Sequence, residues 1–317
     1  MRIIAKRKIA DTAKVLMAIS ITLLVYGIIL NLSTNLGIVG KPVRVENLDN
    51  NKQEISITPS NGNEVVSDDN TNSDSNNRIS DGTSDSVIEK ENSSLRKEIE
   101  KEFSISVRYG KETEGYSVGG VSTTPITDSK VANSTLNSLY DTLSLYPKGL
   151  FKEIKDGGIP LTIVLVNNYS ENSVTGVTDS SYDYANISIA AIYDFGDSFY
   201  HESYHYIERY MFKKKANFNS WDSLNPDDFQ WDTIDGSLSY SNTFKEDAYF
   251  VNNYAQTSGA EDRASTFEYM MANTKASCLN KDTPIWRKAN YMALTIESVF
   301  KTVSPDSIEY WERYIKD

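Results

Sequence analysis

The chain has 317 residues, a formal net charge of −12 and a single cysteine, Cys278. The acidic balance argues against nucleic acid as a partner, because the one basic run after residue 44 is the short stretch 213–215. One cysteine excludes an internal disulfide and any metal site built from several thiolates, which leaves oxygen and imidazole groups as the main possible metal ligands.

The first 14 residues are basic and precede a long uncharged stretch. Asp11 is their only acid, and no charged residue occurs over 15–40. A run of this length can span a bilayer. A cleaved secretory signal is the alternative, but neither a small-residue cleavage site nor a lipobox cysteine follows it. We therefore expect an uncleaved transmembrane anchor at 15–40, with residues 1–14 in the cytoplasm and the rest of the chain outside the membrane.

Residues 41–94 have the composition of a flexible tether. They are rich in Asn, Ser, Asp and Thr and contain no aromatic residue. Such a stretch cannot bury enough apolar surface to offset the entropy lost on ordering it. We expect an acidic, disordered linker that holds a folded domain of residues 95–317 near the membrane surface. A second, small folded domain is the alternative.

The first half of the folded domain shows both helical and strand periodicity. The expected elements, in order, are a helix over 95–103, a strand over 105–109, a second strand over 116–122 paired with it, a helix over 128–145 and a strand over 161–166. The last of these is almost continuously apolar, which is typical of a central strand buried on both faces. Residues 186–192 alternate between apolar and polar, so they predict a strand with one face exposed to water.

Both histidines of the chain stand in one pentapeptide, His201-Glu202-Ser203-Tyr204-His205. On an α-helix, residues four apart lie on the same face, so both imidazoles can bind one metal ion while Glu202 faces a water molecule on it. This is the H-E-x-x-H arrangement of zinc peptidases. An accidental match is the alternative, and the scarcity of histidine in this chain disfavours it.

The residues around the pentapeptide favour the helix that this geometry requires. Asp197 or Ser198 can cap its start. Apolar residues recur at helical spacing and predict its buried stripe: Tyr200, Tyr204, Ile207 and Met211. By analogy with zinc peptidases, in which the strand ahead of the metal helix is an exposed edge that binds substrate, residues 186–192 are our candidate for the upper wall of the cleft. An ordinary sheet edge is the alternative.

A catalytic zinc site with two histidines needs a third protein ligand. No histidine remains, so the ligand must be a downstream carboxylate, and the candidates are the aspartates at 227–235, Glu246, Asp247, Glu261, Asp262 and Glu268. Residues 258–268 predict a second helix, capped by Thr257 or Ser258. A carboxylate in its first turns, beside small alanines that permit close helix approach, is well placed to reach the metal.

The H-E-x-x-H motif, followed by Tyr254 seven residues before Glu261, resembles the gluzincin metallopeptidases of the anthrax lethal factor and Pro-Pro endopeptidase type. The resemblance implies that His201, His205 and Glu261 bind one catalytic zinc ion and that Glu202 is the general base. It also implies that the Tyr254 phenol stabilises the oxyanion.

One departure from the gluzincin pattern concerns the first histidine. Many gluzincins carry a carboxylate four residues after the ligand glutamate, and this chain has Ser265 there. Another group must then orient His201, and Asp262 and Glu268 are the candidates.

The expected fold is an α+β zincin-like domain, with a mixed sheet and the metal helix above the cleft and a mainly helical part below it. Packing helices are expected over 286–300 and 307–315 in the lower part. The expected function is that of a membrane-anchored, extracytoplasmic zinc endopeptidase acting on protein or peptide substrates. The alternative is an inactive surface protein that keeps the fold as a binding module, although such a protein has no need of Glu202.

Overall fold

The computed structural model describes residues 85–171, 174–191, 195–231, 245–272 and 277–316. These residues belong to one compact unit, Asn76–Asp317. The expected anchor at 15–40 and the expected linker up to residue 84 lie outside them. Within the described ranges, no helix is long and apolar enough to cross a membrane.

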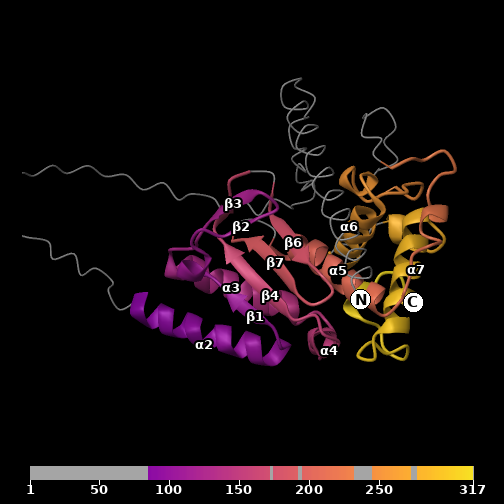
Figure 1. The fold of residues 1–317 in the computed structure, drawn as a ribbon. Helices are drawn as coiled ribbons and strands as arrows, with labels where there is room; N and C mark the ends of the chain where they lie inside the picture. The colour runs from indigo at the N-terminus through magenta and orange to yellow at the C-terminus, as the bar shows by residue number, and fades with distance from the viewer. Residues whose placement is uncertain (1–84, 172–173, 192–194, 232–244, 273–276, 317) are drawn as a thin grey trace, which may run out of the picture. The chain divides into compact units, whose positions relative to one another are not determined.

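The described elements follow one another as Figure 1 labels them. They are α2 (Asp85–Phe103), β1 (Ser106–Arg108), η1 (Gly110–Thr113), β2 (Ser117–Val118), β3 (Val121–Thr124), α3 (Ser129–Leu143), α4 (Leu150–Asp156), β4 (Leu161–Val166), β5 (Asn168–Tyr169), β6 (Gly176–Ser180), β7 (Ala185–Ala190), α5 (Phe195–Lys213), η2 (Asp222–Leu224), η3 (Tyr254–Gln256), α6 (Gly259–Met271), η4 (Ser277–Leu279), α7 (Pro284–Val299) and η5 (Tyr310–Glu312), where η marks a 3-10 turn.

Four strands form the main sheet in the order β1-β4-β7-β6. Strands β1, β4 and β7 run parallel, and β6 pairs antiparallel with β7 at one edge. The strand predicted over 161–166 is β4, and it is central and buried as expected. The mixed α+β architecture predicted from the sequence is therefore present.

The prediction that residues 186–192 form the sheet edge is wrong. Residues 186–190 belong to β7, which lies between β4 and β6, and its polar residue Ser188 is fully buried, while residue 192 lies outside the described residues. The Tyr169 hydroxyl donates a hydrogen bond to the Ser188 carbonyl oxygen at 2.7 Å and lies 2.8 Å from the Ser188 hydroxyl. Because these partners replace water, a polar residue in an alternating pattern does not have to face solvent. Among the described strands, the edge next to β7 is β6, and the opposite edge is β1.

The strand predicted over 116–122 does not pair with the strand at 105–109. Instead β2 and β3 form a hairpin across Gly119 and Gly120, whose positive φ values of 60° and 84° suit a two-residue turn. This hairpin continues through β3 into β5 as a second, three-stranded sheet. Its apolar residues cover one face of the main sheet, in a cluster formed by Val118, Val164, Val166, Tyr169 and Ala190.

Helices cover the other face of the main sheet and enclose the larger core (Figure 1). Helix α3 matches the prediction closely and is capped by Asp128, whose carboxylate accepts hydrogen bonds from two backbone N–H groups. Helix α2 starts at Asp85 and not at Leu95, so it includes residues that the composition assigned to the tether. The buried side chain of Asn92 donates a hydrogen bond to the Ser129 carbonyl at 2.8 Å. Composition alone does not predict a polar contact of this kind, so it placed the start of the folded domain too late.

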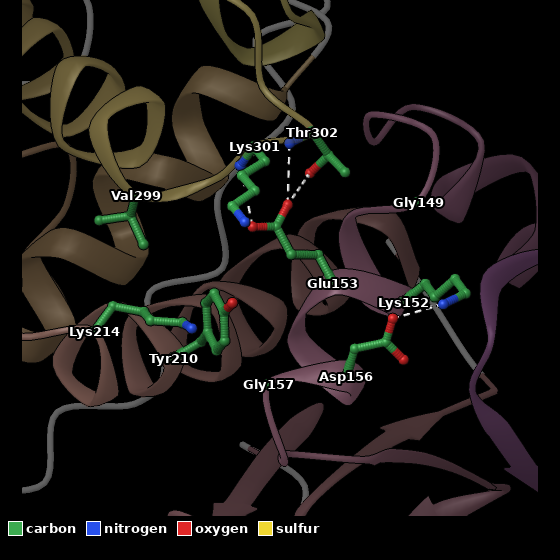
Figure 2. A pocket seen from close by; sticks show the side chains of 10 residues that line it. All are labelled: Gly149, Lys152, Glu153, Asp156, Gly157, Tyr210, Lys214, Val299, Lys301 and Thr302. Atoms are coloured by element: carbon green, nitrogen blue, oxygen red, sulfur yellow. Dashed lines mark hydrogen bonds and ion pairs between the residues drawn. The ribbon is translucent and has the colours of Figure 1, made fainter.

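The C-terminal part contains α6 and α7, and the helix expected over 286–300 is confirmed as α7. Residues 307–315 were expected to be helical, but they contain only the turn η5. A pocket of about 620 Å³ is lined by residues of α4, α5 and the segment after α7 (Figure 2). On one side of the pocket, the Glu153 carboxylate accepts hydrogen bonds from the backbone N–H groups of Lys301 and Thr302 at 3.0 Å each. This contact fastens the end of α7 to the first half of the domain.

Candidate metal centre

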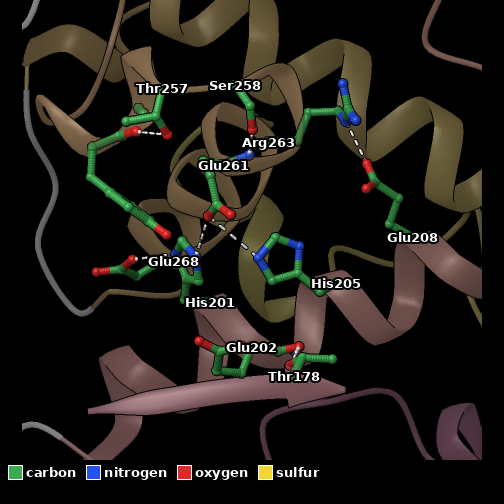
Figure 3. A network of polar contacts seen from close by, with 12 residues as sticks. Thr178, His201, Glu202, His205, Glu208, Thr257, Ser258, Glu261, Arg263 and Glu268 are labelled. Atoms are coloured by element: carbon green, nitrogen blue, oxygen red, sulfur yellow. Dashed lines mark hydrogen bonds and ion pairs between the residues drawn. The ribbon is translucent and has the colours of Figure 1, made fainter. Parts of the chain in front are cut away.

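Helix α5 carries the pentapeptide with both histidines. Its predicted apolar stripe is buried in the core: Tyr200, Tyr204, Ile207 and Met211. The helix begins at Phe195, before either predicted cap, because Phe195 and Phe199 extend the buried stripe by one turn. Ser198 instead donates a hydrogen bond to Thr175 at 2.9 Å. Burial of one face fixes the rotation of α5 and thereby presents the histidine rings to α6 (Figure 3).

Glu261 lies in the first turn of α6 and faces both histidine rings. Its Oε2 atom is 3.0 Å from the Nε2 atom of His201 and 3.5 Å from the Nε2 atom of His205. One ligand atom from each of the three residues lies within 4.8 Å of the others. A tetrahedral zinc ion with bonds of about 2.1 Å separates its ligand atoms by roughly 3.4 Å, so the donor set and its spacing fit this ion.

The start of α6 explains why Glu261 is placed there. Ser258 is the N-cap residue, and its hydroxyl accepts a hydrogen bond from the Glu261 N–H at 3.2 Å. This is one of the two caps that the sequence offered, and it sets the first turn of α6 beside α5. Within the described part of the chain, His201, His205 and Glu261 are the only group that could hold a metal ion.

Two of the other candidate carboxylates, Asp262 and Glu246, have partners other than the histidines. Asp262 is fully buried against α7, where it pairs with Lys288 at 2.7 Å, and it accepts from the Trp221 ring N–H at 2.7 Å. Burial raises the pKa of Asp262 and lowers that of Lys288, although each group attracts the other. Glu246 accepts a hydrogen bond from Asn280 at 3.0 Å. Of the aspartates at 227–235, those beyond residue 231 lie outside the described residues.

Glu268 contacts the outer nitrogen of the first histidine. Its Oε2 atom is 3.1 Å from the Nδ1 atom of His201. Of the two groups that the sequence proposed to orient His201, the structure thus places Glu268 there and turns Asp262 away. A carboxylate at Nδ1 holds a proton on that nitrogen, so that Nε2, the ring nitrogen on the Glu261 side, is the one that can bind a metal.

The pKa values of the cluster share one electrostatic cause. Burial by itself would lower the pKa of His201, but the hydrogen bonds to Glu261 and Glu268 outweigh it and raise this pKa to about 10. Burial would raise the pKa of Glu261, whereas the two histidines hold it well below its usual range. The carboxylates therefore stabilise positive charge at the histidine nitrogens, where a divalent cation would supply it.

Glu202 is directed away from Glu261, toward strand β6 (Figure 3). The Thr178 hydroxyl donates a hydrogen bond to the backbone carbonyl oxygen of Glu202 at 2.8 Å. The contact of β6 with Glu202 was not predicted from the sequence, because the strand has no clear apolar alternation and because the contact joins residues far apart in the chain.

Tyr254 lies beside the histidine cluster, whereas Arg263 is paired elsewhere. Tyr254 lies in η3, with 56% of its surface exposed and its ring centre 5.8 Å from that of His201. Arg263 forms an ion pair with Glu208 and stacks 4.7 Å above the Phe218 ring. The phenol thus lies next to the candidate metal ligands, whereas the guanidinium is engaged on the other side of α6.

The chain matches no protein-family model and no curated protein sequence. Its structure is similar to a solved structure described as a "putative zinc-binding metallo-peptidase" from Bacteroides caccae ATCC 43185, with a TM-score of 0.50. The two sequences are 15% identical, and the similarity covers 72% of this chain and 92% of the other. At this identity the likeness establishes a shared fold, and the chemistry has to be argued from the site.

Proposed function

We propose that the protein is a zinc-dependent endopeptidase whose metal ion is held by His201, His205 and Glu261. The observation that carries this proposal is the convergence of both Nε2 atoms on one Glu261 oxygen, at 3.0 Å and 3.5 Å. Glu268 supports it by occupying the Nδ1 side of His201. The similarity of fold to a protein described as a zinc-binding metallo-peptidase agrees with this choice of metal.

In this proposal, Glu202 and Tyr254 have separate roles in peptide hydrolysis. A bound zinc ion supplies Lewis-acid polarisation of the attacking water and of the substrate carbonyl. Glu202 accepts the proton from the water and returns it to the leaving amine. The Tyr254 phenol donates a hydrogen bond to the developing oxyanion, since its ring lies beside His201 at the open side of the cluster.

The substrate would bind as an extended peptide along strand β6. Three observations favour β6 over the buried β7: the main sheet ends at β6, β6 is antiparallel to β7, and it contacts the backbone of Glu202 through Thr178. The outer N–H and C=O groups of an edge strand can pair with an added strand. This arrangement would place a peptide bond across the face of α5 that carries the histidines.

The proposed function is tested on the purified protein by zinc analysis and by hydrolysis of an unfolded protein substrate. We expect one zinc ion per chain and cleavage that stops when zinc is removed by a chelator and returns when it is restored. Stoichiometric zinc without cleavage would support the inactive binding module. Absence of zinc after growth with the metal would contradict the proposed site.

We also propose that residues 15–40 anchor the protein in a membrane, with the peptidase domain outside the cell. The support is the basic segment 1–14 followed by the uncharged stretch. Protease added to intact cells is expected to cut within 41–84 and to release a soluble fragment that contains the whole domain from Asp85 onward. Protection of this fragment until the membrane is disrupted would contradict the orientation.

A further inference from the structure

Strand β6 approaches Glu202 more closely than a side chain at position 176 would allow. A Cβ atom added to Gly176 would lie 2.8 Å from Glu202 Cγ, 2.9 Å from Ile189 Cδ1 and 3.3 Å from Glu202 Oε1. Real Cβ atoms essentially never come within 3.0 Å of such neighbours. Gly176 is not among the glycines with positive φ, so the backbone conformation does not require glycine here. The requirement is the space that Glu202 and Ile189 occupy.

Thr178 provides a second contact from the same face of β6. Residues two apart on a strand point to the same side, so Gly176 and Thr178 both face α5. The Thr178 hydroxyl holds the carbonyl oxygen of Glu202 at 2.8 Å. The hydroxyl thus fixes the backbone of Glu202 against the strand, while the missing side chain at 176 leaves room for the Glu202 side chain.

We propose that Gly176 is a positioning residue for Glu202: the Glu202 side chain can keep its position against β6 only because position 176 lacks a Cβ atom. This inference rests on the proposed function, in which Glu202 is the general base. A base must lie about 2.6–3.2 Å from the proton-bearing atom. With alanine at position 176, Glu202 Cγ would have to move from 2.8 Å to at least 3.4 Å, where ordinary contacts begin. This displacement is comparable to the whole range of about 2.6–3.2 Å within which a base can accept the proton.

The kinetic test compares Gly176→Ala with the unchanged protein. Because misplacement of a reacting group by about 1 Å can lower the rate about 100-fold, we expect kcat to fall by roughly 10-fold to 100-fold, with KM and zinc content unchanged. In a Glu202→Gln background the base is already absent, so the same change should alter the residual turnover by less than about 2-fold. A change of this size is within the usual deviation from additivity. Equal losses in both backgrounds would overturn the proposal.

Two control variants separate positioning from general disturbance. Ile189→Val removes the Cδ1 atom that a Cβ at 176 would meet, so Gly176→Ala/Ile189→Val should be more stable than Gly176→Ala but equally slow. Gly196→Ala adds a Cβ on α5 whose closest neighbour is the Tyr200 hydroxyl at 3.3 Å, and kcat should stay within about 2-fold. Recovery of kcat in the Ile189→Val double variant would assign the effect to packing and overturn the proposal.

A stability measurement tests the contact without any catalytic readout. Thermal unfolding of the zinc-free protein is compared for Gly176→Ala with and without Glu202→Ala, which removes the Cγ atom in question. Gly176→Ala is expected to lower the Tm by several °C, as overpacking does in a domain of this size, and by distinctly less in the Glu202→Ala background. Equal Tm losses would overturn the proposal. Coupled Tm losses in a protein that cleaves no peptide would uphold the contact and contradict only the proposed function.

Discussion

Replacement of Glu261 by alanine is expected to remove the bound zinc and to abolish peptide hydrolysis. Glu261 is the carboxylate whose Oε2 atom lies near both histidine Nε2 atoms. Its removal leaves two imidazoles, fewer than the three protein ligands of a catalytic zinc site. The N-cap Ser258 and the buried residues of α6 are unaffected, so the fold should persist. Metal analysis after dialysis, together with circular dichroism, checks this result.

Two matched variants make the assignment of Glu261 specific. Glu268→Ala removes the partner of His201 Nδ1 and leaves all three proposed ligands in place, so it should weaken zinc binding only about 10-fold to 100-fold. Glu246→Ala removes an exposed carboxylate that bonds Asn280, and it should leave zinc binding unchanged. If Glu261→Ala kept its zinc under the dialysis that strips Glu268→Ala, the roles of the two glutamates would be reversed.

Replacement of Glu202 by glutamine is expected to leave zinc bound and to lower turnover by about 10²-fold to 10⁴-fold, the usual contribution of a general base. Glu202 is directed toward β6 and takes no part in the convergence of His201, His205 and Glu261 (Figure 3). Glutamine preserves the size of the side chain beside Gly176 but cannot accept the proton. The measurement is kcat at fixed zinc occupancy, with zinc content determined on the same sample.

The result for Glu202→Gln also separates the proposed enzyme from its rival. An inactive binding module has no turnover for the substitution to lower, and trace activity from a contaminant would be the same in both preparations. Loss of zinc from the variant would identify Glu202 as a ligand and contradict the orientation of α5 described above. Unchanged kcat with full zinc would assign the proton transfer to another group.

Local periodicity was enough to predict the two helices of the site. Residues four apart on a helix share a face whatever the rest of the chain does, so the pentapeptide already placed both histidines together, and α5 has the predicted buried stripe. The same reasoning predicted α6 with Ser258 as one of two caps. Singling out Glu261 from the downstream carboxylates required the resemblance to gluzincins, because spacing within one helix says nothing about what faces it.

Only the tertiary structure decided which groups surround the histidines. Glu268 and Asp262 were equal candidates as partners of His201, and the crossing of α6 over α5 turns the first toward the ring and buries the second against Lys288. The sheet edge was predicted wrongly at residues 186–192, because strand order depends on pairings between distant segments and a buried polar residue such as Ser188 gives the same pattern as an exposed one. Gly176 carries no local signal at all, since the reason for its missing side chain is a glutamate that comes beside it only when β6 packs on α5.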